Sequence, residues 1–413
     1  METETPPDEI RKLPEPDPAG DDGEHQMAAT YDAAHAPRQR WWDILPLAGG
    51  GVLLLTLALV ATGQLWHFIT AGVEVLPLLI LALLTSAGTR LHWARVVSGI
   101  WLVGSMIGLV VVSLGFAVGV ALTSLPRRSA GLFTTPMPAD TRTMVLMAAV
   151  AMPAIAIASL IWLWWDARVF ATRWFSIDPD DRRHTIALVF LTDMVISALG
   201  LLAILRGSPP LLTLASKESA EQLAASSSST DQLLALLYQL LWTVPLALIG
   251  AGLFTRRTLP QALRRLAIVV PTWQQALVGI SMGLVLMAVS SLVDQAISSV
   301  WMAMQWPQTD TATFEKLLGS TLSPAGAVMI GLTAGLGEEV SIRGLLQPRF
   351  GLIGANLVFA SAHAYQYGPD ALLSVFFLGT VLGLVRARWN TTVSALAHGT
   401  FDCVAVLANY MGY

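Results

Sequence analysis

Long runs of apolar residues alternate with short polar segments along most of the chain. A run of about 20 apolar residues can cross the hydrocarbon core of a bilayer as a helix. Eleven runs approach or exceed this length, and the second, ninth and tenth are short enough to be re-entrant or interfacial. They cover residues 44–63, 75–89, 96–124, 143–165, 185–205, 232–254, 274–299, 324–342, 351–365, 371–387 and 391–411. The pattern predicts an all-α protein, a polytopic transmembrane helix bundle with about eleven candidate spans.

The composition points to the same class of protein. Of the 413 residues, 54% are hydrophobic and 13% are charged, with a mean hydropathy of +0.61. The charged share is about half of the roughly 25% found in soluble globular domains. The net charge of -4 gives no indication of nucleic-acid binding. We therefore expect an integral membrane protein whose surroundings are the lipid bilayer.

Four stretches differ in composition along the chain. Residues 1–40 are rich in Pro, Asp, Glu and Gly, which predicts a disordered tail. Residues 41–206 hold the first group of predicted membrane helices, which carry no recognisable motif. Residues 207–231 include a run of serines and predict a flexible outer loop. Residues 232–413 form a second transmembrane group.

Basic residues are distributed unequally between the two sides of the predicted bundle. With a cytosolic N-terminus, eighteen Lys and Arg residues fall inside and six fall outside. This bias predicts a protein of the cell (plasma) membrane with its N-terminus in the cytosol. On the inner side, residues 256–273 carry four arginines and then Pro271, which predicts a short amphipathic stretch at the membrane interface.

One polar motif interrupts an apolar segment, at residues 337–344. Ionisable groups are costly at membrane depth, so their presence there suggests a function. On a helix, Glu339 and Arg343 share a face and can pair, which lowers the cost of keeping both charges in the bilayer. Glu338 lies about 100° further round the helix and is free of that pair. A free carboxylate suits a general base.

Two further polar pairs follow at helical spacing, Phe359 with His363 and His398 with Asp402. A lone intramembrane histidine is often no more than a hydrogen-bond partner for a neighbouring helix. Here the three motifs follow one another within about sixty residues. If Glu338 and both pairs converge, they can activate a water molecule and stabilise an oxyanion, as hydrolysis of an amide requires.

The three motifs together resemble those of a known family. The order Glu338-Glu339-x-x-x-Arg343, Phe359-x-x-x-His363 and His398-x-x-x-Asp402 is similar to that of the CPBP family. This family contains the CAAX proteases and bacteriocin-processing intramembrane proteases, related to the Rce1 prenyl endopeptidases. The resemblance covers about residues 320–411, and residues 1–270 show none.

The resemblance implies a role for each motif residue. Glu338 would activate the hydrolytic water with the help of His363, and His398 and Asp402 would stabilise the oxyanion. The supporting residues would be Glu339, Arg343 and Phe359. Eukaryotic members often have Asn where this chain has Asp402, and an Asp donates to an oxyanion only when protonated.

Metal dependence stays open at this point. His363, His398 and Asp402 are residue types that zinc commonly uses as ligands. The zinc-protease signature His-Glu-x-x-His is absent from the chain. We expect no obligatory metal, with a divalent ion such as zinc as the alternative.

The leading hypothesis is thus an intramembrane endopeptidase that acts on a peptide or protein substrate. One alternative is a non-catalytic membrane scaffold or bacteriocin-immunity protein that retains the fold. A transporter is a further alternative, because Asp193 and Asp294 also lie inside predicted spans. It lacks the paired, Gly- or Pro-broken helices that such proteins carry in two matching halves.

Overall fold

The computed structural model describes residues 54–73, 75–125, 138–215 and 228–412. The predicted tail, residues 1–40, and most of the predicted outer loop, residues 216–227, lie outside the described residues. Within the described ranges the protein is helical, and the only extended pairing is an isolated bridge between Leu253 and Arg257. The predicted all-α membrane fold is therefore confirmed.

The helices fall into two runs along the chain. The first run contains α3 (Leu65–Ala71), α4 (Leu76–Ala87), α5 (His92–Thr123), α6 (Ala139–Ser159), η1 (Leu160–Leu163), α7 (Trp165–Ala171), α8 (Arg182–Ile204) and α9 (Pro210–Leu214). The second contains α11 (Ser229–Gly250), α12 (Leu259–Arg265), α13 (Trp273–Ala303), α14 (Thr311–Leu318), η2 (Gly319–Thr321), α15 (Pro324–Leu332), η3 (Thr333–Glu338), η4 (Val340–Leu346), α16 (Gln347–Ala362), α17 (Pro369–Arg388) and α18 (Thr391–Tyr410).

The number of spans is lower than predicted. Among the described residues, eight helices are long and apolar enough to cross a membrane, or nine if a bent pair at Leu54–Ala71 forms one span. The run at 75–89 gives only the 12-residue helix α4. The runs at 324–342 and 351–365 lie in one helical stretch, Pro324–Ala362, but the chain kinks at Gly351 (φ 67°), which separates two helices there.

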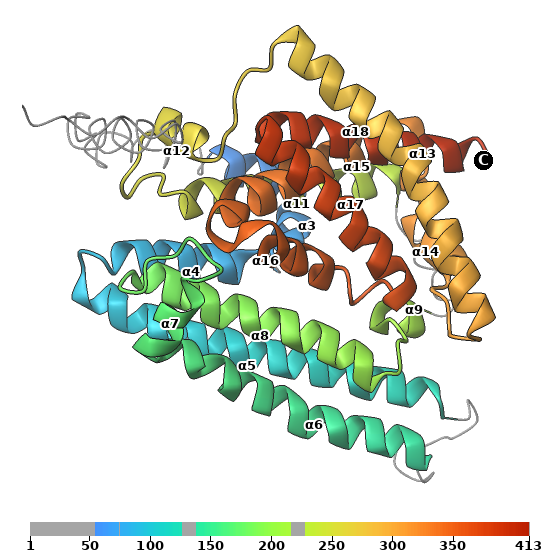
Figure 1. The fold of residues 1–413 in the computed structure, drawn as a ribbon, viewed down its shortest axis with the longest axis horizontal. Helices are drawn as coiled ribbons and strands as arrows, with labels where there is room; N and C mark the ends of the chain where they lie inside the picture. Colours follow the sequence, from blue (N-terminus) through green and yellow to red (C-terminus); the bar gives the residue numbers. More distant parts are fainter. Residues whose placement is uncertain (1–53, 74, 126–137, 216–227, 413) are drawn as a thin grey trace, which may run out of the picture. The chain divides into compact units, whose positions relative to one another are not determined.

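Helices α5, α6 and α8 of the first run lie side by side (Figure 1). They share two clusters of buried apolar side chains, one around Val189 and one around Leu201. Other large apolar side chains on the same helices point outward, among them Ile100 and Val150, which are 68% and 73% exposed. Apolar residues on the outside as well as the inside are what a lipid environment permits.

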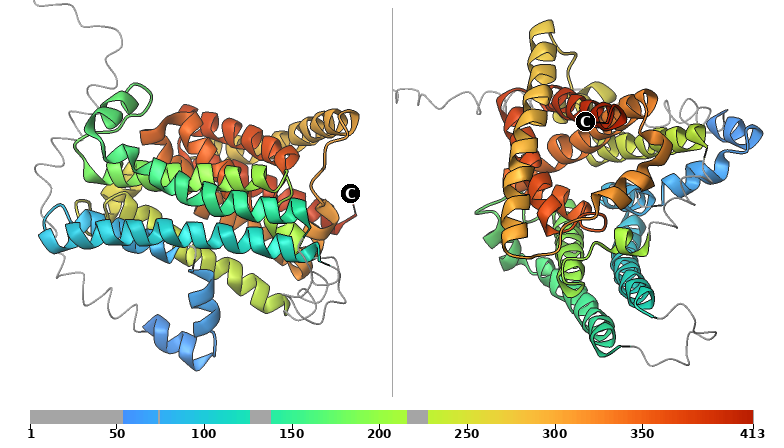
Figure 2. Two further views of the ribbon diagram at one scale, coloured as in Figure 1. Left: turned by 90° about the horizontal axis from the view of Figure 1, so that it is seen from below. Right: turned by 90° about the vertical axis from the view of Figure 1, so that its right-hand side faces the viewer.

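The second run surrounds α18, which packs against α13, α15 and α17 (Figures 1 and 2). The Asn390 side chain caps α18 by accepting a hydrogen bond from the backbone N–H of Val393. The Ser323 hydroxyl caps α15 in the same way, accepting from Gly326. These two caps fix where each helix begins and hence the height at which its polar residues lie.

The α15–η3 stretch approaches α18 as closely as backbone allows. A Cβ at Gly399 would lie 2.6 Å from the carbonyl oxygen of Gly331, and one at Gly335 would lie 2.5 Å from that of Ala395. Small residues four apart allow helices in membranes to meet at this distance. We call this contact between Gly331, Gly335 and Gly399 the glycine seam. It places Glu339 of the polar motif against His398 of α18.

Candidate active site

The polar motif lies on π-helical turns rather than on the regular α-helix that its spacing predicted. Residues Thr333–Glu338 form η3 and residues Val340–Leu346 form η4, with Glu339 between them. A π-turn inserts an extra residue into a helix and is frequent at functional sites. The wider π-turns of the helix thus lie at the two adjacent carboxylates, Glu338 and Glu339.

Glu339 is the buried centre of the motif. Its Oε2 accepts a hydrogen bond from Ser394 Oγ at 2.5 Å, and its Oε1 lies 3.1 Å from His398 Nδ1. Arg343 Nε lies 3.5 Å from Oε2. The carboxylate is completely buried, so these three partners replace its hydration. Glu339 thereby connects the motif helix to α18.

Arg343 is held by a charge and an aromatic face. Its side chain is fully buried, and the guanidinium lies over the ring of Phe359, 4.9 Å from the centroid. None of its three side-chain nitrogens has a hydrogen-bond partner among the described residues. The Glu339 carboxylate and the π-face of Phe359 therefore compensate the buried cation.

Phe359 also joins the two histidines. Its ring meets that of His363 edge-on at 4.9 Å and that of His398 at 5.9 Å between centroids. On the other side of His363, the ring of Tyr367 stacks almost parallel, with 4° between the planes. A row of four rings thus runs from α18 across the end of α16.

The two imidazoles present different atoms to the space between the helices. His398 Nδ1 donates to Glu339, because a carboxylate only accepts, and Nε2 then faces Asp402 Oδ2 at 3.6 Å. His363 Nδ1 donates to the carbonyl oxygen of Phe359 at 2.9 Å. In a neutral imidazole this leaves His363 Nε2 as a hydrogen-bond acceptor.

Glu338 is the uncommitted carboxylate of the cluster. It is partly buried and makes no hydrogen bond or ion pair with any described residue. Its charge nevertheless acts on His398, Asp402 and Tyr367, so it lies within electrostatic range of all three. The charge of His363 acts on Asp402 as well. Glu338, His363 and His398 therefore all lie within electrostatic range of Asp402.

The cluster contains two further residues that the sequence motifs did not indicate. Ser394 supplies the hydroxyl that holds Glu339, one turn before His398. Tyr367 lies in the turn after α16, where burial, followed by the charges of Asp402 and Glu338, raises its pKa. Its phenol therefore keeps its proton at neutral pH and remains a donor. The spacing of Ser394, four residues before His398, was the signal in the sequence.

The residues considered as zinc ligands are not arranged as a set. No group of three or more His, Cys, Asp or Glu side chains in the described ranges is placed to hold a metal ion. The Nδ1 atoms of His363 and His398 are each used by a protein acceptor, which leaves only the two Nε2 atoms for other contacts. Their arrangement gives no support to a zinc site at His363, His398 and Asp402.

The two other acids inside predicted spans, Asp193 and Asp294, each accept a hydrogen bond from a serine. Asp193 is fully buried in α8, and Ser197 of the next turn donates to its Oδ1 at 3.4 Å. Asp294 of α13 is exposed and accepts a hydrogen bond from Ser374 on α17. Asp294 thus contacts a neighbouring helix.

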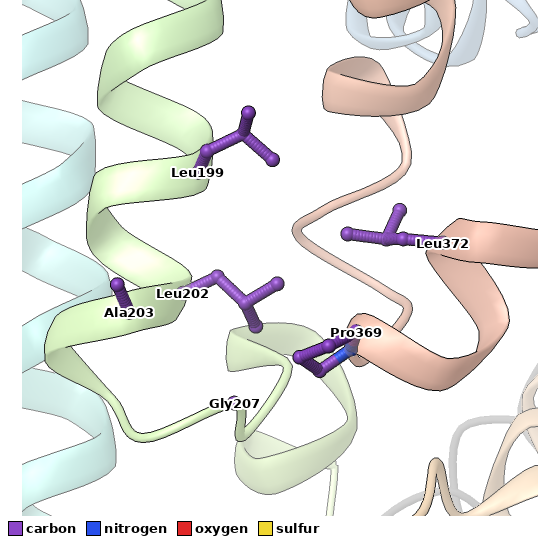
Figure 3. A pocket seen from close by; sticks show the side chains of 6 residues that line it. All are labelled: Leu199, Leu202, Ala203, Gly207, Pro369 and Leu372. Atoms are coloured by element: carbon purple, nitrogen blue, oxygen red, sulfur yellow. The ribbon is translucent and has the colours of Figure 1, made fainter. Parts of the chain in front are cut away.

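An apolar pocket of about 300 Å³ lies between α8 and the start of α17 (Figure 3). Leu199 and Leu202 line one side and Leu372 lines the other. Leu202 and Leu372 belong to the same apolar cluster as Ala364, with Tyr367 packed against it. The pocket borders the residues beside His363 but contains none of the polar groups of the site.

Comparison with known families bears on the segment that holds this cluster. Residues 320–404 match the family model described as type II CAAX prenyl endopeptidase Rce1-like. This segment is an Rce1-like domain. The match confirms the family that the three motifs resemble, and it includes every candidate site residue from Glu338 to Asp402. No curated protein and no solved structure matches the chain.

The matched family is one of prenyl endopeptidases. The match supports a peptidase, and the eight apolar helices among the described residues identify an integral membrane protein. The helices before residue 320 lie outside the matched segment.

Proposed function

We propose that the protein is an intramembrane endopeptidase that hydrolyses a peptide bond with a water molecule activated by Glu338. The observation that supports this most strongly is the difference between the two adjacent glutamates. Glu339 is buried and tied to three side chains, whereas Glu338 has no such partner beside His398 and Asp402. A general base must have its carboxylate free to take a proton from water.

In the first step, Glu338 removes a proton from the water, and the unpaired Nε2 of His363 accepts the other O–H. The water oxygen attacks the carbonyl carbon of the substrate, and the carbonyl oxygen becomes an oxyanion. In the second step, protonated Glu338 transfers its proton to the amide nitrogen. The C–N bond breaks and releases an amine and a carboxylic acid, so one water molecule is consumed for each bond.

The oxyanion requires donors that are already in place. Glu339 fixes the orientation of His398, and an imidazolium at this position presents Nε2–H toward Asp402 and the space beside it. Asp402 either stabilises that imidazolium or, when protonated, donates a hydrogen bond itself. Glu339, Arg343 and Phe359 hold this donor in position and do not touch the substrate.

The substrate is a peptide or protein segment that enters from the bilayer. The site lies among apolar helices, and the neighbouring pocket has an apolar lining. A segment that reaches Glu338 must therefore be compatible with lipid on at least one side.

The proposal is tested by mapping new peptide N-termini in membranes that contain the wild-type protein, Glu338→Gln or Glu315→Gln. Glu315 is an exposed glutamate that pairs with Asn409, so its variant is the matched control. We expect termini that appear with the wild type and the control and are absent with Glu338→Gln. The same termini at full yield with Glu338→Gln would favour the non-catalytic scaffold or immunity protein.

A further inference from the structure

Four arginines from separate elements meet near the predicted inner ends of the helices. They are Arg257 after α11, Arg265 in α12, Arg349 in the first turn of α16 and Arg386 in the last turn of α17. Hydrogen bonds bring these elements together: Arg265 Nη1 donates to the carbonyl oxygen of Gly344 at 3.3 Å, and Gln347 Nε2 of α16 donates to that of Gly383 in α17 at 2.8 Å. In keeping with this, the charges of Arg349, Arg257 and Arg386 all act on Arg265, and those of Arg349 and Arg183 act on Arg257. We call these four residues the arginine cluster.

The arginine cluster has no acidic partner. In the described part of the chain, no ion pair joins any of the four to an Asp or Glu, whereas nearby Arg183 is paired with Asp181. Burial lowers the pKa of Arg265 to about 10, and the charges of its three neighbours add to this effect. Four half-buried cations that repel one another are unfavourable unless an anion joins them.

Most donors of the arginine cluster are also unused. Arg257 Nη1 donates to the carbonyl of Ala251 at 2.6 Å, and Arg265 Nη1 to that of Gly344 at 3.3 Å. Arg349 Nη1 donates to the carbonyl of Ser176 at 3.2 Å. The Nε of Arg386 is buried and has no partner. Each guanidinium has five N–H groups, so the cluster keeps many donors for an oxyanion.

The surroundings of the cluster are suited to the membrane interface. Apolar side chains on both sides of α12 are exposed, including Leu259 at 48%, Val270 at 93% and Trp273 at 73%. Aromatic and aliphatic side chains next to arginines are typical of segments that lie at the level of lipid headgroups. The ligand with both matching properties is a lipid whose headgroup carries a phosphate and a net negative charge.

We propose that the arginine cluster binds the headgroup of an anionic phospholipid, with the phosphate between Arg265 and Arg386 and the acyl chains beside the exposed apolar residues of the α12 segment. Arg265 also donates to Gly344 in η4, five residues from Glu339, so the lipid contacts an arginine that is hydrogen-bonded to the motif helix. The binding itself does not depend on peptidase activity.

The test measures phosphatidylglycerol retained by the purified full-length protein in detergent, by native mass spectrometry, with phosphatidylcholine as the uncharged comparison. We expect Arg265→Gln/Arg386→Gln to retain phosphatidylglycerol about 30-fold less tightly, since each arginine contributes about fivefold near a charged headgroup. Arg256→Gln/Arg264→Gln removes the same charge from exposed arginines of the same segment and should retain the lipid.

A second pair, Arg349→Gln/Arg386→Gln, keeps the test open if the first variant does not fold, and it should show the same loss. Equal losses in the cluster pair and the exposed pair would overturn the proposal in favour of a diffuse basic surface. Undiminished retention in both cluster pairs would also overturn it. If inorganic phosphate stabilises the protein against thermal unfolding as much as phosphatidylglycerol does, the assignment to a lipid is wrong.

Discussion

Neighbouring residues of the motif differ in what surrounds them. Glu338 and Glu339 are adjacent in sequence and chemically identical, yet Glu339 is fully buried with three partners and Glu338 is partly exposed. The cause is the geometry of the helix, which turns the Glu339 carboxylate toward Ser394 and His398 on α18 and points the Glu338 carboxylate in a different direction, where it makes no hydrogen bond with a described residue. We assign chemistry to the free carboxylate and positioning to the bound one.

The buried pair of Glu339 and Arg343 gives a prediction for stability. Arg343→Met leaves a buried carboxylate without its cation and should lower the free energy of unfolding by about 3–5 kcal/mol. The double variant Arg343→Met/Glu339→Gln removes both charges and should recover part of this loss. Thermal unfolding of the purified proteins in detergent measures both effects.

Arg142→Met is the control for this prediction, because Arg142 is an exposed arginine in the first turn of α6. Its unfolding temperature should stay near that of the wild type. If Arg343→Met is as stable as the control, the pair does not support the site in the way that we infer.

At the residue scale, spacing along the sequence was sufficient for contacts within one helix. The pairs Glu339–Arg343 and His398–Asp402 lie within 3.6 Å, as residues four apart on a helix should. Contacts between different helices could not be predicted from spacing along the sequence. The hydrogen bonds of Glu339 to Ser394 and His398 span more than fifty residues, and they depend on how α18 lies against the motif helix.

At the scale of elements, the glycine seam between α15–η3 and α18 sets the distance between the motif and His398. Gly331, Gly335 and Gly399 bring backbone against backbone. Any side chain at Gly399 must push the helices apart, because a Cβ there would lie 2.6 Å from a carbonyl oxygen. The seam and the hydrogen bonds of Glu339 therefore depend on each other.

Gly399→Ala tests this dependence. We expect it to lower the free energy of unfolding by about 1–3 kcal/mol, the usual cost of overpacking, and to lower peptidase activity as His398 moves from Glu339. Gly108→Ala in α5 is the control, since a Cβ there meets nothing within 4 Å. Equal unfolding temperatures and cleavage rates for the two variants would contradict the role of the seam.

Element boundaries were harder to predict than element type. Hydrophobic runs correctly indicated helices throughout the described residues, because a bilayer requires satisfied backbone groups. The run at 75–89 is apolar but forms only a 12-residue helix, and the break near 342–351 is confined to Gly351. The π-turns on either side of Glu339 left no signal in the apolar periodicity of the sequence.

At the scale of the whole molecule, the distribution of charge and the position of the helix ends agree. The four residues of the arginine cluster come from elements that the charge bias assigns to one side, and the structure brings them together. We predict that this side faces the cytosol. The helices before residue 320 show no polar motif. Among them, α13 packs against α17 and α18 of the Rce1-like domain, α11 packs against α15, η3 and η4, and α8 packs against α16.

Labelling of single cysteines tests the orientation. In a Cys403→Ser background, which removes the one natural cysteine, Arg388→Cys lies at the inner end of α17 and Thr311→Cys at the start of α14. A membrane-impermeant maleimide added to intact cells should label Thr311→Cys and not Arg388→Cys. Opening the cells should expose both, and the reverse pattern in intact cells would contradict the predicted orientation.

The central claim is that Glu338 performs the chemistry and is not needed for folding. It is tested most directly by measuring cleavage rate and unfolding temperature on the same purified Glu338→Gln protein, with a peptide found by the mapping of new termini. We predict a cleavage rate lower by about 10²–10⁴-fold, as for loss of a general base, and an unfolding temperature equal to that of the wild type. A rate close to that of the wild type would contradict the assignment of Glu338.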